Sequence, residues 1–222
     1  MKPDRRIAEA FIRYALRIGA VDGSRMRRTK SGRLSPYFFN SGAFSMGESL
    51  DKLLLAYAEA LYPYLYTWDL PVMFGPAYKG TLLVPALALT LWREYDMRVY
   101  FASKRKEAKD HGEGGTLIGT PLRGQRVMIV DDVISDGASK REAVEFIRRE
   151  GGVLAGCVIA FDRKEKGEET NLSAAEQFEW EYQVPLIAAA TIDDLISVLM
   201  EDGHHSEMFN SLVAYQQQYG VS

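Results

Sequence analysis

Short, continuous apolar runs separated by helical patterns constrain the fold of this chain more than any other feature. Runs rich in Val, Ile, Leu and aromatic residues occupy 72–74, 98–102, 125–133, 153–161 and 185–190. Apolar residues recur at helical spacing between and after them, which predicts helices over 79–94, 137–149, 173–180, 193–200 and 206–219. A strand that is apolar along its whole length is covered on both faces, which is typical of parallel sheets between helical layers. The sequence therefore predicts an α/β fold with a central, mostly parallel sheet flanked by helices.

The segment before residue 66 follows a different pattern. Helical periodicity predicts helices over 4–18 and 48–62, the second ending before Pro63, and Pro85 is expected to kink the helix over 79–94 or delay its start. Residues 20–46 are rich in Gly, Ser and Arg and are expected to form irregular structure or short strands beside the main domain.

The organisation expected is a single domain over 1–222. Helices and a small hood occupy about 1–65, and the α/β core occupies about 66–222. Residues 103–120 are charged and Gly-rich without an apolar period, which predicts an exposed, mobile loop.

Composition excludes several classes of protein. The net charge of −3 argues against general nucleic-acid binding, which usually shows a basic domain. A single cysteine, Cys157, cannot form an intramolecular disulfide and is consistent with a reducing compartment. The N-terminus lacks a signal-peptide pattern, and no apolar run is long enough to span a bilayer. We therefore expect a cytoplasmic protein with no membrane or nucleic-acid partner.

The segment Val127–Ser139 carries the strongest chemical signal. Four apolar residues end in Asp131-Asp132, and a turn containing Gly137 then opens a helix. A helix N-terminus offers unpaired N–H groups and a partial positive charge to a phosphate, while paired carboxylates can accept hydrogen bonds from the vicinal hydroxyls of a ribose. The competing interpretation is a turn whose acids merely cap the helix. The predicted contacts to a ribose phosphate are Asp131, Asp132, Val133, Ile134, Ser135, Asp136, Gly137, Ala138 and Ser139.

A second signal is the basic segment 105–115. It places four potential cations ahead of three glycines: Arg105, Lys106, Lys109 and His111. Cations held against a departing anion are most effective in a closed, dry site, and glycines allow a loop to open and close. A solvated charged loop is the alternative when this segment is taken alone.

These segments together resemble a known enzyme family. The Asp-Asp turn resembles the phosphoribosyl pyrophosphate signature of type I phosphoribosyltransferases, although Asp136 and Ala138 replace the small neutral residue and the Thr of commoner versions. The basic loop and the segments 30–40, 74–80 and 161–167 resemble the orotate phosphoribosyltransferases, most closely the bacterial homodimeric form. The resemblance spans roughly residues 1–220 and implies the type I fold with a small hood formed largely by the N-terminal segment.

The resemblance also implies roles for individual residues. Phosphoribosyl pyrophosphate would be contacted by Lys30, Tyr78, Lys79, Arg105, Lys106, Lys109 and His111 as well as by the turn after the acidic pair. Orotate would be contacted by Phe38, Phe39, Ser135 and Arg163. The residues expected to act in catalysis are Lys109, His111 and Arg105, some of them across the interface of a homodimer.

The reaction implied is transfer of phosphoribose to orotate, with Mg²⁺ bridging substrate oxygens and few direct protein ligands. A planar guanidinium at Arg163 suits a carboxylate, and its loss of a partner would disfavour bases without one. Glu165 is expected to serve only solvation. No His or Cys spacing suits zinc, so no protein metal site is predicted.

Three alternatives stay open from sequence. The chain could act on another base, such as uracil or a purine. It could be a non-catalytic regulator that senses phosphoribosyl pyrophosphate, although a helix-turn-helix partner for its N-terminal helix is missing. It could also be a phosphate-binding structural protein.

Overall fold

The computed structural model describes residues 5–29, 32–65, 70–109, 115–134, 137–167, 170–203 and 206–221, with the backbone alone for 106–109 and 206. Its centre is a six-stranded sheet in the order β10-β9-β8-β5-β6-β7. The strands are β5 (Val72–Gly75), β6 (Phe101–Lys109), β7 (Gly115–Gly119), β8 (Arg126–Val130), β9 (Val153–Asp162) and β10 (Leu186–Thr191). Every neighbouring pair is parallel except β6 and β7, which confirms the mostly parallel sheet.

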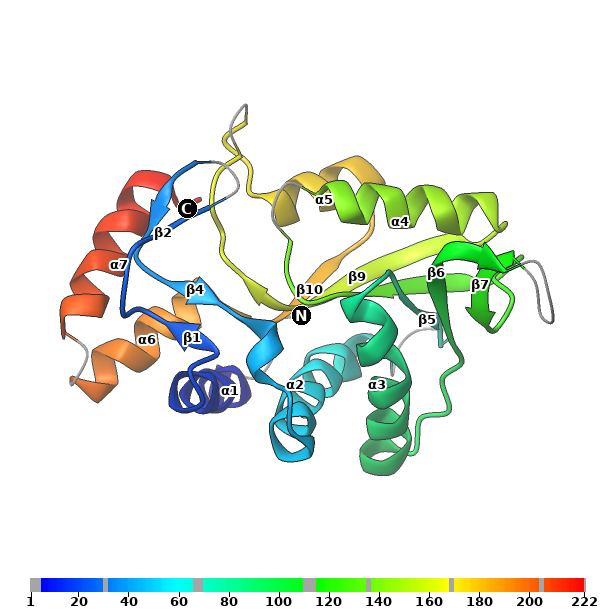
Figure 1. The fold of residues 1–222 in the computed structure, drawn as a ribbon, viewed down its shortest axis with the longest axis horizontal. Coiled ribbons are helices and arrows are strands. Elements are labelled where there is room, and N and C mark those ends of the chain that lie inside the picture. Colours follow the sequence, from blue (N-terminus) through cyan, green and yellow to red (C-terminus); the bar gives the residue numbers. More distant parts are fainter. Residues whose placement is uncertain are drawn as a thin grey trace.

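Helices cover both faces of this sheet (Figure 1). On one face lie α4 (Ala138–Arg149) and α5 (Ala174–Tyr182). On the other lie α1 (Arg5–Arg17), α2 (Gly47–Leu65) and α3 (Lys79–Tyr95). The last two helices, α6 (Ile192–Asp202) and α7 (Ser206–Tyr219), pack on each other beside α1. None of the helices in the described part of the chain has the length and apolarity needed to cross a bilayer.

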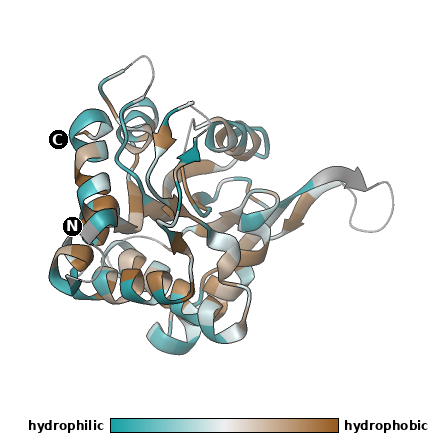
Figure 2. Cartoon of the chain, turned by 60° about the vertical axis from the view of Figure 1, so that its left-hand side comes forward, coloured by the Kyte–Doolittle hydropathy of each residue, from teal (hydrophilic) through white to brown (hydrophobic). Residues whose placement is uncertain are grey.

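The apolar strands are continuous because alternate residues enter two different cores. Met128 and Val130 of β8 belong to the cluster that includes α1, α2 and α3, whereas Val127 and Ile129 belong to the cluster that includes α4. Successive side chains of a strand point to opposite faces, so a sheet covered on both sides needs apolar residues at every position. Figure 2 shows the resulting apolar sheet between helices whose outer faces are polar.

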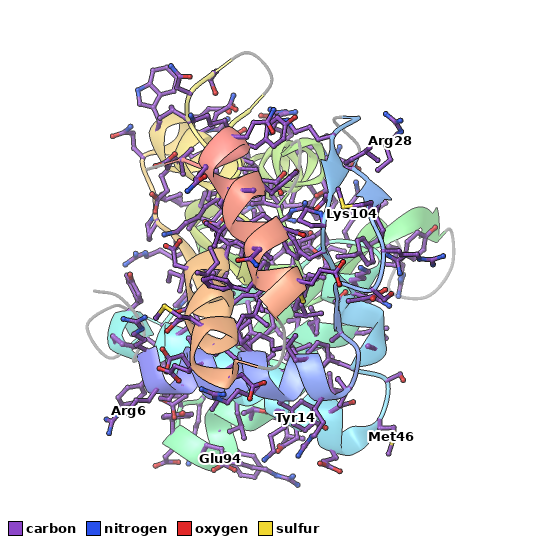
Figure 3. All side chains as sticks on the ribbon, turned by 90° about the vertical axis from the view of Figure 1, so that its left-hand side faces the viewer. Arg6, Tyr14, Arg28, Met46, Glu94 and Lys104 are labelled. Carbon is purple, nitrogen blue, oxygen red and sulfur yellow. The ribbon has the colours of Figure 1, made fainter. Side chains whose placement is uncertain are left out.

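A hood formed by residues 21–29 and 32–43 stands at one edge of the domain. Two short antiparallel pairs build it: β1 (Val21–Asp22) with β4 (Phe38–Phe39), and β2 (Arg27–Arg28) with β3 (Leu34–Ser35). A 3₁₀ turn, η1 (Ser41–Ala43), follows. Figure 3 labels Arg28 on β2.

The hood is tied to the segment after β9 and to α7. Arg33 donates to the carbonyl oxygens of Lys166 at 2.7 Å and Gly167 at 3.3 Å, and its guanidinium carbon lies 4.9 Å from the Tyr219 ring centroid. Lys166 N in turn donates to Tyr219 O at 2.8 Å. The N-terminal segment and the C-terminal helix therefore brace the same wall of the molecule.

The segment 103–120 corrects the sequence analysis most clearly. Where an exposed loop was expected, β6 continues to Lys109 and pairs with β7, and the two strands form an arm that projects from the sheet (Figure 2). A two-stranded ribbon at the edge of a sheet buries little, so it needs no apolar period and escapes a search for one. Conversely, residues 98–100 precede β6 and are not part of it.

Two prolines lie inside helices rather than at their ends. The helix α2 passes through Pro63 to Leu65, two residues beyond it, so the proline removes only one hydrogen bond in the last turn. The helix α3 begins at Lys79 with Pro85 inside it, so the expected delay in its start does not occur.

Candidate active site

The order of the sheet creates a crevice between β5 and β8. These strands are neighbours, but the chain leaves β5 through α3 toward β6 and leaves β8 through α4 toward β9, on opposite sides. Ligands of parallel sheets bind outside the carboxyl ends of the strands at such a switch point. A cavity of about 800 Å³ lies here between the strand ends and the hood. The residues singled out from sequence that line it are Phe38, Phe39, Lys79, Asp132, Val133, Ile134, Gly137 and Arg163.

The turn after β5 brings Lys79 to the crevice through a close backbone approach. A Cβ on Gly75 would lie 2.2 Å from the carbonyl oxygen of Gly80, and one on Gly80 would lie 2.7 Å from that of Val130. Only glycines allow the start of α3 to press against the end of β8 in this way. The Ala77–Tyr78 peptide bond is cis, and the Tyr78 side chain is exposed rather than part of the cavity lining.

Asp132 is the acidic residue that faces the cavity. Its Oδ2 accepts hydrogen bonds from Lys79 Nζ and, at 2.6 Å, from Ser41 Oγ, and its Oδ1 accepts from Val133 N at 2.9 Å. Burial alone would raise the pKa of this carboxyl, but the hydrogen bonds and the charges of Lys79 and Lys140 hold the pKa below its usual value. The associated stability is present above about pH 4 and is lost as the pH falls through the folded-state pKa.

Asp131 points away from the cavity into the protein. Its Oδ2 pairs with Lys140 Nζ, and its Oδ1 accepts from Asp132 N at 3.0 Å. Its carbonyl oxygen accepts from Tyr57 Oη at 2.7 Å. The two adjacent carboxylates therefore have different environments, which their adjacency in sequence does not reveal.

The turn between β8 and α4 ends at Gly137, which has φ +71° and caps the helix. A Cβ there would lie 2.9 Å from Arg141 Nη1, so the Arg141 guanidinium sits beside the turn, and Arg141 also lines the cavity. Ala138 and Ser139 are exposed in the first turn of α4. Ser135 and Asp136 lie outside the described residues.

Arg163 is held firmly in the opposite wall. Its Nε and Nη2 donate to Glu165 Oε1 at 2.8 Å and 2.5 Å, and Nη2 also donates to Ser35 Oγ at 3.0 Å. Its guanidinium carbon lies 5.0 Å from the Tyr37 ring centroid. Burial would lower the pKa of Arg163, but Tyr37 and Glu165 outweigh it and raise that pKa, so Arg163 is a fixed cation.

The two phenylalanines of β4 play different parts. Phe39 is buried and stacks on Phe161, with ring centroids 5.1 Å apart and planes 10° apart. Phe38 is exposed and lies under the guanidinium of Arg27, whose carbon is 5.0 Å from the ring centroid. Phe39 thus belongs to the core as well as to the cavity wall, while Phe38 presents a ring to solvent.

The basic segment is described only in part. Arg105 is half-buried on β6, and Lys106 and Lys109 are described by their backbone alone. Lys30 and His111 lie outside the described residues. The roles assigned to these side chains therefore stay predictions.

Several side chains in this site were not singled out from sequence. Glu165 was expected to serve solvation, but it pairs with Arg163, so that expectation is wrong. Ser35 and Ser41 give no signal in a local pattern, because their partners are 128 and 91 residues away. Lys140 did carry a signal, since a lysine in the first turn of a helix opposes the helix dipole.

Comparison with known proteins agrees with this geometry. Residues 48–189 match the phosphoribosyl transferase domain family. An orotate phosphoribosyltransferase of Nitrosococcus oceani is 48% identical over 192 residues, which cover 86% of each chain. That of Cronobacter sakazakii is 44% identical over 221 residues and the full length of both chains. The crystal structure of the Francisella tularensis orotate phosphoribosyltransferase superposes with a TM-score of 0.83 at 29% identity, covering 95% of this chain and 99% of that one.

The family match spans well over half of the chain, and relatives above 40% identity cover it almost end to end. The superposition covers the switch point of the sheet, where this chain places Lys79 beside Asp132. The chain therefore belongs to the orotate phosphoribosyltransferases, within the phosphoribosyl transferase domain family.

Proposed function

We propose that the cavity between the strand ends and the hood is where this enzyme transfers the 5-phosphoribosyl group of phosphoribosyl pyrophosphate to orotate. The products are orotidine 5′-monophosphate and pyrophosphate, a step of pyrimidine biosynthesis. The observation that carries the proposal is the meeting of Lys79 and Asp132 across the switch point, beside the N-terminus of α4.

The phosphoribosyl donor fits along the ends of β5 and β8. Its 5-phosphate would lie at the N-terminus of α4, where Gly137 leaves room, backbone N–H groups point outward and Arg141 lines the cavity. The ribose hydroxyls would then reach Asp132, and the pyrophosphate would lie toward Lys79. In this placement each anionic part of the donor meets a cation or a helix N-terminus.

The acceptor fits against the hood. Arg163 would bind the orotate carboxylate, and its pairing with Glu165 and Ser35 fixes the guanidinium before the substrate arrives. The backbone and ring of Phe38 and Phe39 would border the base. Orotate is an anion, so the transfer needs orientation and charge stabilisation rather than a strong general base.

Magnesium would bind at this site together with phosphoribosyl pyrophosphate. Asp132 is the carboxylate of the acidic pair that lines the cavity, and no cluster of three or more His, Cys, Asp or Glu suited to a metal occurs in the described ranges. Mg²⁺ commonly binds through one or two carboxylates together with substrate phosphates. When bound, it would neutralise charge on the pyrophosphate.

We further propose that Arg105, Lys106, Lys109 and His111 stabilise the departing pyrophosphate. The arm formed by β6 and β7 supports this role, because β6 pairs with β5, and the turn after β5 leads to Lys79 at the start of α3. Closure of the arm over the site would exclude water and strengthen these charges.

A homodimer is the assembly we propose. Tyr78, Leu82, Leu89 and Trp92 are exposed on one stripe at the start and along α3, although each is large and apolar or aromatic. A stripe of this kind usually marks a protein interface. We propose that a second copy binds here and that its arm reaches the Lys79 end of the first site. We also propose a single domain and a cytoplasmic location, which a lone, buried cysteine supports.

The placement of the donor is tested by thermal unfolding with its magnesium complex. At about 100 times the dissociation constant, binding should add about 2.7 kcal/mol and raise Tm by about 5–10 °C. Asp132→Asn should remove most of this shift, whereas Asp51→Asn, at an exposed position on α2, should retain it. A full shift in the Asp132→Asn protein would contradict the placement.

A further inference from the structure

Lys140 occupies a position that is unfavourable for a lysine. It lies in the first turn of α4, where the partial positive charge of the helix opposes a cation, and its side chain is 2% exposed. Its ammonium nevertheless has an acceptor for each proton: Asp131 Oδ2, Val133 O at 2.7 Å and Ser139 Oγ at 3.4 Å. A buried ammonium is tolerated only when it is paired and hydrogen-bonded in this way.

The three acceptors lie at both ends of the turn that follows β8. Asp131 and Val133 begin the turn, and Ser139 is already on α4. Helical side chains point back toward the N-terminus of their helix, so Lys140 reaches underneath the turn. The opposite side of the same turn, with Asp132, Ile134 and Gly137, lines the cavity. Lys140 therefore holds the turn from the side that the substrate does not touch.

The contacts of Asp131 continue this support to its neighbour. One carboxylate oxygen is taken by Lys140 and the other by the backbone N–H of Asp132, while Tyr57 holds the carbonyl oxygen. These hydrogen bonds fix the backbone at Asp132 and therefore the direction in which the Asp132 side chain points. The pair of Asp131 and Lys140 is neutral as a unit, so of the two adjacent acids Asp132 is the one that presents its carboxylate to the cavity.

We propose that Lys140 is a positioning residue that holds the Asp131 carboxylate inside the protein, where it supports the turn. Asp132 is then the one member of the acidic pair that contacts the ribose. The proposal rests on the proposed function in placing phosphoribosyl pyrophosphate at this turn. The sequence pattern predicts that both Asp131 and Asp132 bind the ribose. Here Asp132 binds it, and Asp131 has a structural role.

A double-mutant cycle on Asp131 and Lys140 tests this division of roles. Lys140→Met and Asp131→Asn each leave one buried charge without its partner, and each should raise KM for phosphoribosyl pyrophosphate at least about tenfold. KM for orotate should stay within about twofold, because the opposite wall is untouched. The double variant, a neutral pair of similar size, should return KM for phosphoribosyl pyrophosphate to within about threefold of the wild-type value. Glu142→Gln, which removes an exposed ion pair of α4 with Lys104, is the matched control and should change neither KM.

The outcomes distinguish a structural role of Asp131 from direct binding of the ribose by Asp131. If Asp131 bound the ribose directly, the double variant would be as poor as Asp131→Asn, and the proposal would be overturned. If the single variants do not fold, the comparison of the double variant with wild type decides alone, and a double variant that is unfolded or retains the high KM also overturns it. Failure of the wild-type protein to bind phosphoribosyl pyrophosphate would instead count against the proposed function.

Discussion

Replacing Lys109 by alanine should slow turnover by about 10²–10³-fold, the usual effect of removing one group that stabilises developing charge. The arm buries little of the core, so the thermal unfolding midpoint should stay within a few degrees of wild type. Turnover is measured at saturating substrates, and Lys52→Ala, an exposed lysine on α2, is the control. A Lys109→Ala protein with near-normal turnover would end the role proposed for the basic segment.

The same variant also tests the homodimer. Subunits carrying Lys109→Ala, mixed with subunits carrying Asp132→Asn, should regain up to about a quarter of the wild-type rate if the arm acts on the partner's site, because half of randomly formed dimers are mixed and each has one complete site. When Trp92→Glu, on the exposed stripe of α3, is added to both variants, the subunits should fail to form mixed dimers and the mixture should regain no activity. Verified mixed dimers without activity would contradict action across the interface.

Arg163→Ala should impair the use of orotate selectively. Loss of a charged hydrogen-bonding partner of the carboxylate, at about 1.5–3 kcal/mol per bond, corresponds to a fall in kcat/KM for orotate of about 10–100-fold or more. KM for phosphoribosyl pyrophosphate should change little, because we propose that the donor binds on the other side of the cavity. An equal loss for both substrates would count against the carboxylate role.

The Arg163→Ala variant has to be compared with a second variant, because Arg163 also forms an ion pair with Glu165. Removing the arginine alone leaves a largely buried carboxylate unpaired, which can lower stability by itself. The double variant Arg163→Ala/Glu165→Gln removes that charge. It should recover the unfolding midpoint but not the use of orotate, which separates a structural loss from a loss of recognition.

The sheet and its helices could be predicted from sequence because the apolar pattern within each strand indicates that the strand is buried. Val127 to Val130 are apolar at every position, which is typical of a parallel strand covered by helices on both faces. The arm was missed for the opposite reason. Its two strands pair with each other at the edge of the sheet, and the pairing of Lys104 with Leu117 leaves no periodicity to detect.

The site could be predicted only as far as its residues are close in sequence. The acidic pair, the turn at Gly137 and Lys79 follow from local patterns at strand ends. The sequence could not reveal that Asp131 turns inward while Asp132 turns outward, since this depends on Lys140, Tyr57 and Ser41 in other elements. Glu165 is two residues from Arg163, but the fold decides whether it faces solvent or the guanidinium.

The choice of orotate as the acceptor is tested directly by the absorbance change of orotate on incubation with the enzyme, Mg²⁺ and phosphoribosyl pyrophosphate. Uracil and hypoxanthine should be tested beside it under the same conditions. Orotate should be consumed with stoichiometric release of pyrophosphate, and uracil and hypoxanthine should react at least about 100-fold more slowly, because neither offers Arg163 a carboxylate. Consumption of uracil or hypoxanthine in preference to orotate, or no reaction with any of the three, would contradict the choice of orotate as the acceptor.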